Sequence, residues 1–293
     1  MAEHSIPVDL YNPGQVFACL GFLEAADVLL GDAEGGFDWR DQTSVHFNLR
    51  AKGNRNPVEA VLEFLAEAKV SSVAPANSKH DTRKWQVPTA ILNEEQPFPF
   101  PLPPSPAALP ALLEGTDATL VIDHWGDAID ATGRDNVKFW AGSGGYPGAA
   151  LARDALDLVR DQIGGAVNDP FSLSAPQSSS FRFDWRRDYI PMDVGFSPNE
   201  HADLTMVGFP LVEILAAIGL GNARPKRITK LEYHYSVVAA AEIGGLISPV
   251  FLRAALGGAE LPFLQRFFRM KLGWPGQENQ ARCIIEVVEE TRL

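Results

Sequence analysis

The chain has 293 residues, of which 46% are hydrophobic, 21% charged and 10% aromatic. This composition is ordinary for a folded globular protein, and it excludes a disordered, collagen-like or coiled-coil chain. The formal net charge of −12 argues against a protein that coats nucleic acid by itself, because binding to phosphates depends on Lys and Arg.

The N-terminal part of the chain predicts an opening of strand, helix and strand. An apolar run over 6–10 is typical of a short strand. Asn12 as N-cap and Pro13 at the first helical position begin a helix, which we expect to end at Gly31. Residues 44–50 alternate apolar and polar side chains, as a strand with one buried face does. Such an opening is typical of RRM-like and ferredoxin-like folds.

The same helix signal occurs a second time, and a proline-rich segment follows. Asn56 and Pro57 predict a helix that continues to about residue 68, and 85–92 predicts a strand. The segment 97–110 is rich in proline, which is unsuited to a helix interior or a central strand. We interpret it as a connector packed over its own domain, with a PxxP-type ligand as the functional alternative.

These patterns predict an α+β fold with mixed sheets and packed helices. We divide the chain into an N-terminal α/β unit over 1–96, the connector over 97–110 and a larger α+β part over 111–293, with one continuous domain as the alternative. In the larger part we predict helices over 146–163 and 209–220 and strands over 118–125, 136–142, 181–190, 228–243, 263–273 and 281–290.

No stretch in the sequence approaches the ~20 uncharged apolar residues of a membrane helix, and the first residues do not resemble a signal peptide. We therefore expect a cytoplasmic protein with no membrane partner. Cys19 and Cys283 lie in apolar stretches and are expected in the core, since two thiols supply neither a disulfide framework nor a zinc site.

A glycine-rich stretch is the first candidate binding site. Gly142, Ser143, Gly144 and Gly145 follow a predicted strand and precede a predicted helix, so bare N–H groups there can face an anion. The Lys and Ser/Thr of a P-loop are missing, which argues against ATP hydrolysis. The structural alternative is a tight turn that needs positive φ.

Catalytic patterns are not found in the sequence. It contains no HExxH, CxxC or GxSxG motif, and the adjacent Asp123 and His124 point to opposite faces of a predicted strand. Lone histidines are more often structural than metal ligands. We therefore expect no enzymatic activity, no cofactor and no metal.

Basic residues interleaved with aromatic ones give a stronger signal. Three clusters lie over 79–85, 182–187 and 224–230, and Lys and Arg beside aromatic residues suit the phosphates and bases of single-stranded nucleic acid. A solvated charged surface is the alternative. With the glycine-rich stretch and two residues of the strand before it, the candidate nucleic-acid-binding residues are Lys79, Arg83, Lys84, Trp85, Lys138, Trp140, Gly142, Ser143, Gly144, Gly145, Arg182, Arg186, Arg187, Lys226, Arg227 and Lys230.

Several segments, in order, resemble a family. VDLYNPGQVFACLGFLEAADVL, WGDAIDATGRDNVKFWAGSGG, FRFDWRRDYIPMDVGFSPNEH and PLVEILAAIGLGNARP are similar to a subunit of the CRISPR-Cas type I-U systems, also called type I-G. The resemblance covers most of the chain, and no single motif in it is diagnostic. It implies a non-catalytic subunit of the crRNA-guided surveillance complex, Cascade, in antiviral defence.

The resemblance also implies a position and partners. We expect a small large-subunit-like protein that contacts target DNA and its protospacer-adjacent motif, with the other Cascade subunits, crRNA and a recruited helicase-nuclease as partners. A RAMP-like backbone subunit that binds crRNA is the nearby alternative. From other classes, a small-molecule phosphate-binding enzyme and an interaction protein without a nucleic-acid role stay open.

The division of charge fits an assembly. Residues 1–170 carry 24 Asp and Glu against 12 Lys and Arg, whereas 171–293 carry 13 of each. An acidic face can dock on basic partner subunits while a basic face meets RNA or DNA.

Overall fold

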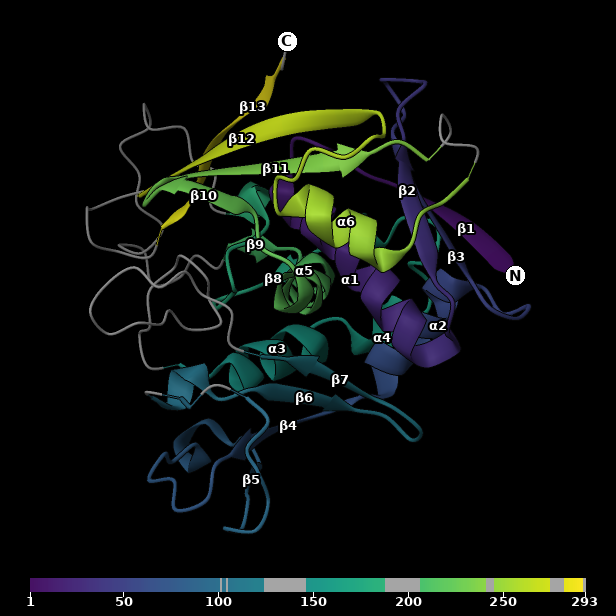
Figure 1. Cartoon of the computed structure of the whole chain (residues 1–293). Helices are drawn as coiled ribbons and strands as arrows, with labels where there is room; N and C mark the ends of the chain where they lie inside the picture. The colour runs from purple at the N-terminus through teal and green to yellow at the C-terminus, as the bar shows by residue number, and fades with distance from the viewer. Residues whose placement is uncertain are drawn as a thin grey trace.

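The structure is a computed structural model that describes residues 1–100, 102–103, 105–123, 146–187, 206–240, 245–274 and 282–291. Its described part combines helices with mixed and antiparallel sheets (Figure 1), so the predicted α+β class is confirmed.

The helices are α1 (Pro13–Leu30), α2 (Pro57–Glu67), α3 (Gly148–Asp157), α4 (Arg160–Ile163), α5 (Pro210–Asn222) and α6 (Pro249–Leu256). The short 3₁₀ turns are η1 (Arg83–Trp85), η2 (Pro106–Ala108), η3 (Pro170–Ser172) and η4 (Trp185–Arg187). The strands are β1 (Ala2–Pro7), β2 (Glu34–Asp38), β3 (His46–Ala51), β4 (Lys69–Ala74), β5 (Thr89–Ile91), β6 (Ala111–Glu114), β7 (Thr119–Ile122), β8 (Ala175–Pro176), β9 (Val207–Gly208), β10 (Lys226–Thr229), β11 (Glu232–Val238), β12 (Gln265–Gly273) and β13 (Cys283–Glu290).

The helices α1 and α5 cross at the centre of the molecule, with the sheets around them (Figure 1). Two glycines allow the backbones to touch. A Cβ at Gly21 would lie 1.9 Å from the carbonyl oxygen of Leu215, and one at Gly219 would lie 2.3 Å from that of Phe17. Only glycine fits at such a close approach, so the crossing depends on this pair.

By length and composition alone, the helix α1 is also apolar enough to cross a membrane. The sequence predicted no membrane helix. The apolar window of α1 is 78% buried inside the protein, and the core helix of a folded domain meets the same criterion. Its N-cap is Asn12, whose side chain accepts the N–H of Gly14, and Gly31 ends it at a φ of +80°, as predicted.

The first sheet has the strand order β1-β3-β2, with both outer strands antiparallel to β3. The strand β2 was missed from the sequence, because Gly35 and Gly36 weaken its strand signal. In a ferredoxin-like fold, β4 would complete this sheet beside β1, but it pairs instead with β5 and β6. The predicted RRM-like opening is therefore not confirmed.

The second sheet, in the order β5-β4-β6-β7, contains strands from both sides of the proline-rich segment. The strand β4 runs parallel to β5 and antiparallel to β6, so residues before 97 and after 110 share one set of backbone hydrogen bonds. The segment thus links neighbouring strands of one sheet, which favours the alternative of one continuous domain.

The third sheet, in the order β10-β11-β12-β13, covers α1 on one face. Tyr235 and Phe268 stack at a centroid distance of 5.2 Å, Tyr235 meets Phe17 edge-on, and its hydroxyl donates to the carbonyl oxygen of Leu10 at 2.8 Å. The strands predicted over 263–273 and 281–290 are confirmed as β12 and β13.

Three predicted elements differ from the structure. The segment 181–190 was expected to be a strand, but its described part is irregular up to η4, and Arg182 has a φ of +66°. The helix predicted over 146–163 divides into α3 and α4. The strand expected over 228–243 is, in its described part up to residue 240, the end of β10 and the whole of β11, which pair as an antiparallel hairpin, and 241–243 lie outside the described residues.

Candidate functional site

The first basic cluster lies on a turn between β4 and β5. Buried Thr82 anchors the turn, because its hydroxyl contacts the carbonyl oxygen of Val87 at 3.1 Å and the hydroxyl of Thr89 at 2.5 Å. The three cations of the cluster are exposed: Lys79, Arg83 and Lys84. The Arg83 side chain is 90% exposed and pairs with Asp81 at 2.9 Å. The cluster therefore presents its cations to solvent from a fixed backbone.

Trp85 forms the aromatic part of this cluster. The ammonium of Lys84 lies 4.1 Å from the centre of the Trp85 ring, which itself meets Tyr146 edge-on at 6.3 Å. The indole is partly exposed. A ring with Lys84 over it and further exposed cations on the same turn suits stacking of an unpaired base beside phosphate contacts.

A polar network from α3 holds Trp85 in place. The guanidinium of Arg153 donates to the carbonyl oxygens of Trp85 at 2.5 Å and Gln86 at 3.1 Å and pairs with Asp154. The Tyr146 hydroxyl donates to the same Asp154, and burial with this contact raises the pKa of Tyr146 to about 12. Sequence reasoning missed these residues, because they lie more than 60 positions away.

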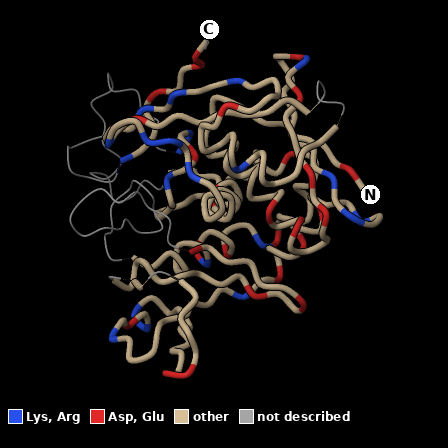
Figure 2. The backbone as a smooth tube through the Cα atoms, viewed as in Figure 1, with Lys and Arg blue, Asp and Glu red and all other residues tan. Residues whose placement is uncertain are grey.

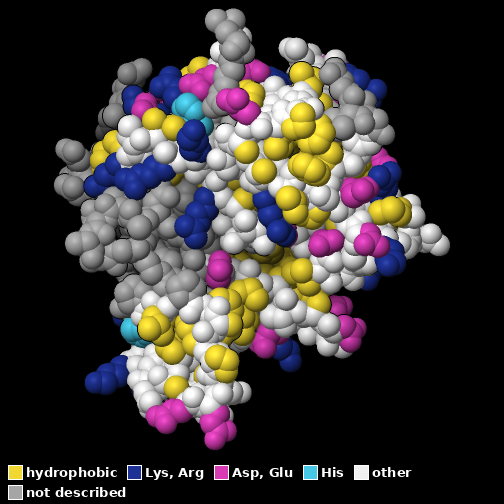
Figure 3. Space-filling model, viewed as in Figure 1, with side chains coloured by type: hydrophobic (Ala, Val, Ile, Leu, Met, Phe, Trp, Pro, Cys, Tyr) yellow, Lys and Arg dark blue, Asp and Glu magenta, His cyan; other side chains and the backbone are white. Residues whose placement is uncertain are grey.

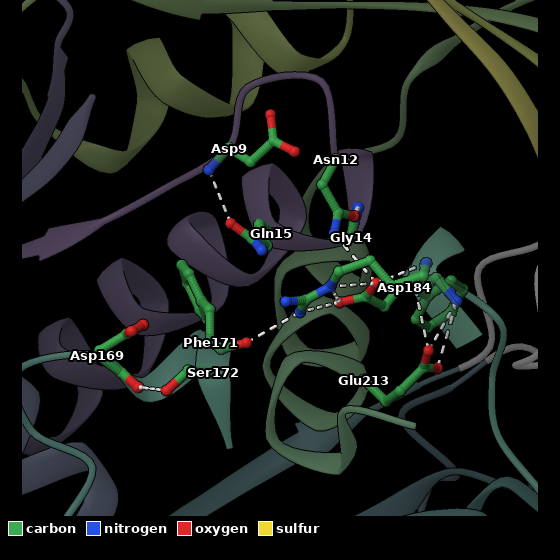
Figure 4. A network of polar contacts seen from close by, with 11 residues as sticks. Asp9, Asn12, Gly14, Gln15, Asp169, Phe171, Ser172, Asp184 and Glu213 are labelled. Carbon is green, nitrogen blue, oxygen red and sulfur yellow. Dashed lines mark hydrogen bonds and ion pairs between the residues drawn. The ribbon is translucent and has the colours of Figure 1, made fainter. Parts of the chain in front are cut away.

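The second cluster has a different role, because it belongs to a buried polar network (Figure 4). Asp184 is fully buried and accepts hydrogen bonds from Asn12 Nδ2 at 3.0 Å and from Arg186 Nη2 at 2.5 Å. Arg186 also donates to the carbonyl oxygen of Phe171 at 2.9 Å, and its guanidinium lies 3.3 Å from the centre of the Phe209 ring. Arg186 thus ties η4 to η3 and to the residue before α5, while Asp184 joins the same network to Asn12 at the start of α1.

Arg187 is buried as well. Its Nη2 donates to the carbonyl oxygens of Gln177 at 3.0 Å and Ser178 at 3.1 Å. Arg182 is partly buried and takes part in contacts of its own. The sequence prediction placed Arg182, Arg186 and Arg187 on a nucleic-acid surface. In the structure Arg187 is buried and Arg186 is partly exposed, and both donate to oxygen atoms of the protein itself.

Glu213 on α5 completes this network. Its carboxylate accepts the backbone N–H groups of Phe183 and Asp184 at 3.1 and 3.0 Å. Complete burial, together with the nearby negative charge of Asp184, raises the pKa of Glu213 to about 8. A Cβ at Gly14 would lie 2.5 Å from the carbonyl oxygen of Phe183, so the segment also packs directly on α1.

The third cluster lies on β10 and the turns on either side of it, and β10 pairs only with β11 among the described strands. Lys226 and Lys230 are exposed, and Arg227 is partly buried with its Nε 3.3 Å from the carbonyl oxygen of Thr229. In Figure 2, basic positions mark both β10 and the turn before β5, at the upper and lower left of the view. The first and third clusters are therefore on separate elements.

The neighbouring sheet face is balanced in charge. Arg269 pairs with Glu232 at 3.2 Å and with Glu290 at 3.4 Å, and His234 lies 3.5 Å from Glu290. Such a ladder of opposite charges is typical of a solvated sheet face. The excess positive charge therefore belongs to the β10 edge and not to this face.

The other predicted residues, Lys138, Trp140, Gly142, Ser143, Gly144 and Gly145, lie outside the described residues. Within the described ranges, no group of three or more His, Cys, Asp or Glu side chains is arranged to hold a metal ion. Cys19 and Cys283 are buried, as predicted, and burial raises the pKa of the Cys19 thiol well above its usual value.

No family model, no curated protein and no solved structure matches this chain.

Proposed function

We propose that this chain is a non-catalytic subunit of a crRNA-guided surveillance complex of CRISPR type I-U (type I-G), and that it contacts target DNA. The exposed cluster around Trp85 carries this proposal. Lys84 lies over a partly exposed indole, and Lys79 and Arg83 are exposed on the same turn, whose backbone Arg153 of α3 holds. Cations beside an accessible aromatic ring suit the phosphates and bases of single-stranded nucleic acid. The resemblance of the four sequence segments supplies the identity of the assembly.

The net charge of −12 is consistent with a subunit that works inside an assembly. In such a complex the basic edges meet nucleic acid, while guide pairing reads the sequence. Lys226 of β10 and Lys230 in the turn after it are a second contact with nucleic acid in this proposal.

A RAMP-like backbone subunit is the second candidate. The β1-β3-β2 order matches three strands of the RRM-like arrangement, which favours this alternative. The pairing of β4 with β5 and β6 argues against it.

Binding of labelled single-stranded DNA to the assembled complex, measured across a salt titration, tests the proposal. We expect the triple variant Lys79→Ala, Arg83→Ala, Lys84→Ala to weaken binding and to lower the slope of log affinity against log salt by roughly 0.7 for each phosphate that the protein no longer neutralises. A matched control removes three exposed cations elsewhere, Arg40, Lys52 and Lys69. Equally weakened binding in both triple variants would refute a specific contact at the Trp85 cluster.

A further inference from the structure

A hollow of about 410 Å³ lies where α1, α2 and the β6–β7 turn meet. Its apolar lining includes Val28 of α1, which is 57% exposed, and Phe64 of α2. The turn presses on Phe64 so closely that a Cβ at Gly115 would lie 2.6 Å from the ring. Figure 1 shows the end of α1 and α2 above this turn, at the right of the molecule. We name this hollow the α1–α2 groove.

The rim of the α1–α2 groove is acidic. Glu63, Glu67 and Asp117 line it, and all three are exposed. Among the described residues that line it, Arg55 is the only cation, and Arg55 is already paired with Glu63. No cation of the described lining is therefore left to pair with Glu67 or Asp117.

The helix ends add to this negative potential. The helix α1 ends at the groove and has no basic residue in its last turn, so its C-terminal partial negative charge faces the same region. Arg160 does meet the carbonyl oxygens of Leu65 and Ala66 at the end of α2, but it is itself paired with Asp157. The groove thus combines exposed apolar surface with an excess of negative charge. Acidic side chains gather at the right of the space-filling view, beside apolar ones (Figure 3).

We infer that the α1–α2 groove docks a partner protein through a segment that carries Lys or Arg beside apolar side chains. Such a segment places its apolar groups on Val28 and Phe64 and its cations on Glu67 and Asp117. Nucleic acid is excluded as the occupant by the sign of the charge. This inference goes beyond the proposed function, because it concerns a protein contact on a different surface from the Trp85 cluster and does not require a nucleic-acid role.

Fluorescence anisotropy with three short labelled peptides tests the inference. One alternates Leu with Lys, the second alternates Leu with Glu, and the third alternates Ser with Lys. We expect the Leu-Lys peptide to bind the full chain most tightly, since it alone satisfies both the apolar floor and the acidic rim. Equal binding of the Ser-Lys peptide, or tighter binding of the Leu-Glu peptide, would overturn the inference.

Variants locate the binding on the groove. Glu67→Lys with Asp117→Lys should weaken the Leu-Lys peptide at least about tenfold, which corresponds to about 1.4 kcal/mol. The control, Glu95→Lys with Glu286→Lys, makes the same change in net charge at exposed positions elsewhere and should retain binding. Val28→Ser should weaken the peptide without altering charge, and thermal melts of each variant show that the fold is intact.

Two results contradict the groove as a docking site for a basic segment. If the control pair weakens binding as much as the groove pair, the peptide responds only to net charge. If the wild-type chain self-associates in size-exclusion chromatography and the groove pair alone abolishes this, the occupant is a second copy of the chain.

Discussion

The buried carboxyl of Glu213 predicts an unusual dependence of stability on pH. Its pKa rises from the ordinary 4.5 to about 8 on folding, because burial and the charge of Asp184 disfavour the ionised form. A group whose pKa is raised in this way binds its proton more tightly in the folded state. Its contribution to the free energy of unfolding is therefore fully present below pH 4.5 and is lost as pH rises through 8.

The size of this effect follows from the shift. Each pKa unit corresponds to ~1.36 kcal/mol, so the shift of Glu213 amounts to roughly 5 kcal/mol over its whole range and to roughly 3 kcal/mol between about pH 5.5 and pH 8.5. This is a large part of the ~5 to 15 kcal/mol that stabilises a typical domain.

The variant Glu213→Gln isolates this effect. The amide oxygen can still accept the N–H groups of Phe183 and Asp184, which both contact Oε1, but the group no longer ionises. We expect the variant to be more stable than the wild type at pH 8.5, with the difference shrinking toward pH 5.5.

Urea unfolding followed by circular dichroism, at several pH values, measures the difference between the two proteins. Glu95→Gln, at an exposed position, is the control and should follow the wild type. Parallel stability curves for wild type and Glu213→Gln between about pH 5.5 and pH 8.5 would refute a carboxyl that titrates in the core.

Two further predictions concern the α1 helix. Gly21→Ala should destabilise the protein by at least about 2 kcal/mol, because its Cβ would meet the backbone of α5, whereas Gly164→Ala, with open space around it, should be nearly neutral in the same melts. Asn12→Ala should lower the free energy of unfolding, measured with urea, by more than Asn56→Ala does. Both substitutions remove a helix cap worth about 1 kcal/mol, but only Asn12 also donates a hydrogen bond to buried Asp184. If the two variants of either pair lose the same free energy of unfolding, the contacts described for Gly21 or for Asn12 are contradicted.

Local signals predicted the helices best. The Asn-Pro pairs at 12–13 and 56–57 begin α1 and α2 as predicted, since capping is a matter of neighbouring residues. The strand β4 was missed, because its two central serines interrupt the apolar pattern. Its stability comes from pairing with β5 and β6, which no local pattern reveals.

Long-range contacts explain why part of the candidate site could not be predicted. In the sequence, Arg186 and Arg187 resemble the exposed cations of the first cluster, and only the fold brings Asp184 and the carbonyl oxygen of Gln177 to them. The same limit applies to Arg153, which reaches Trp85 from α3. A run of cations in the sequence therefore indicates a binding surface only if the fold leaves the side chains exposed and does not pair them within the protein.

Native mass spectrometry of the chain co-expressed with a tagged backbone subunit and a repeat array tests the central proposal most directly. We expect one assembly that contains this chain, the backbone subunit and crRNA, and that binds target DNA more weakly when Lys79, Arg83 and Lys84 are replaced by Ala. Recovery of the backbone subunit and crRNA without this chain, from cells that express all of them in soluble form, would contradict the proposal.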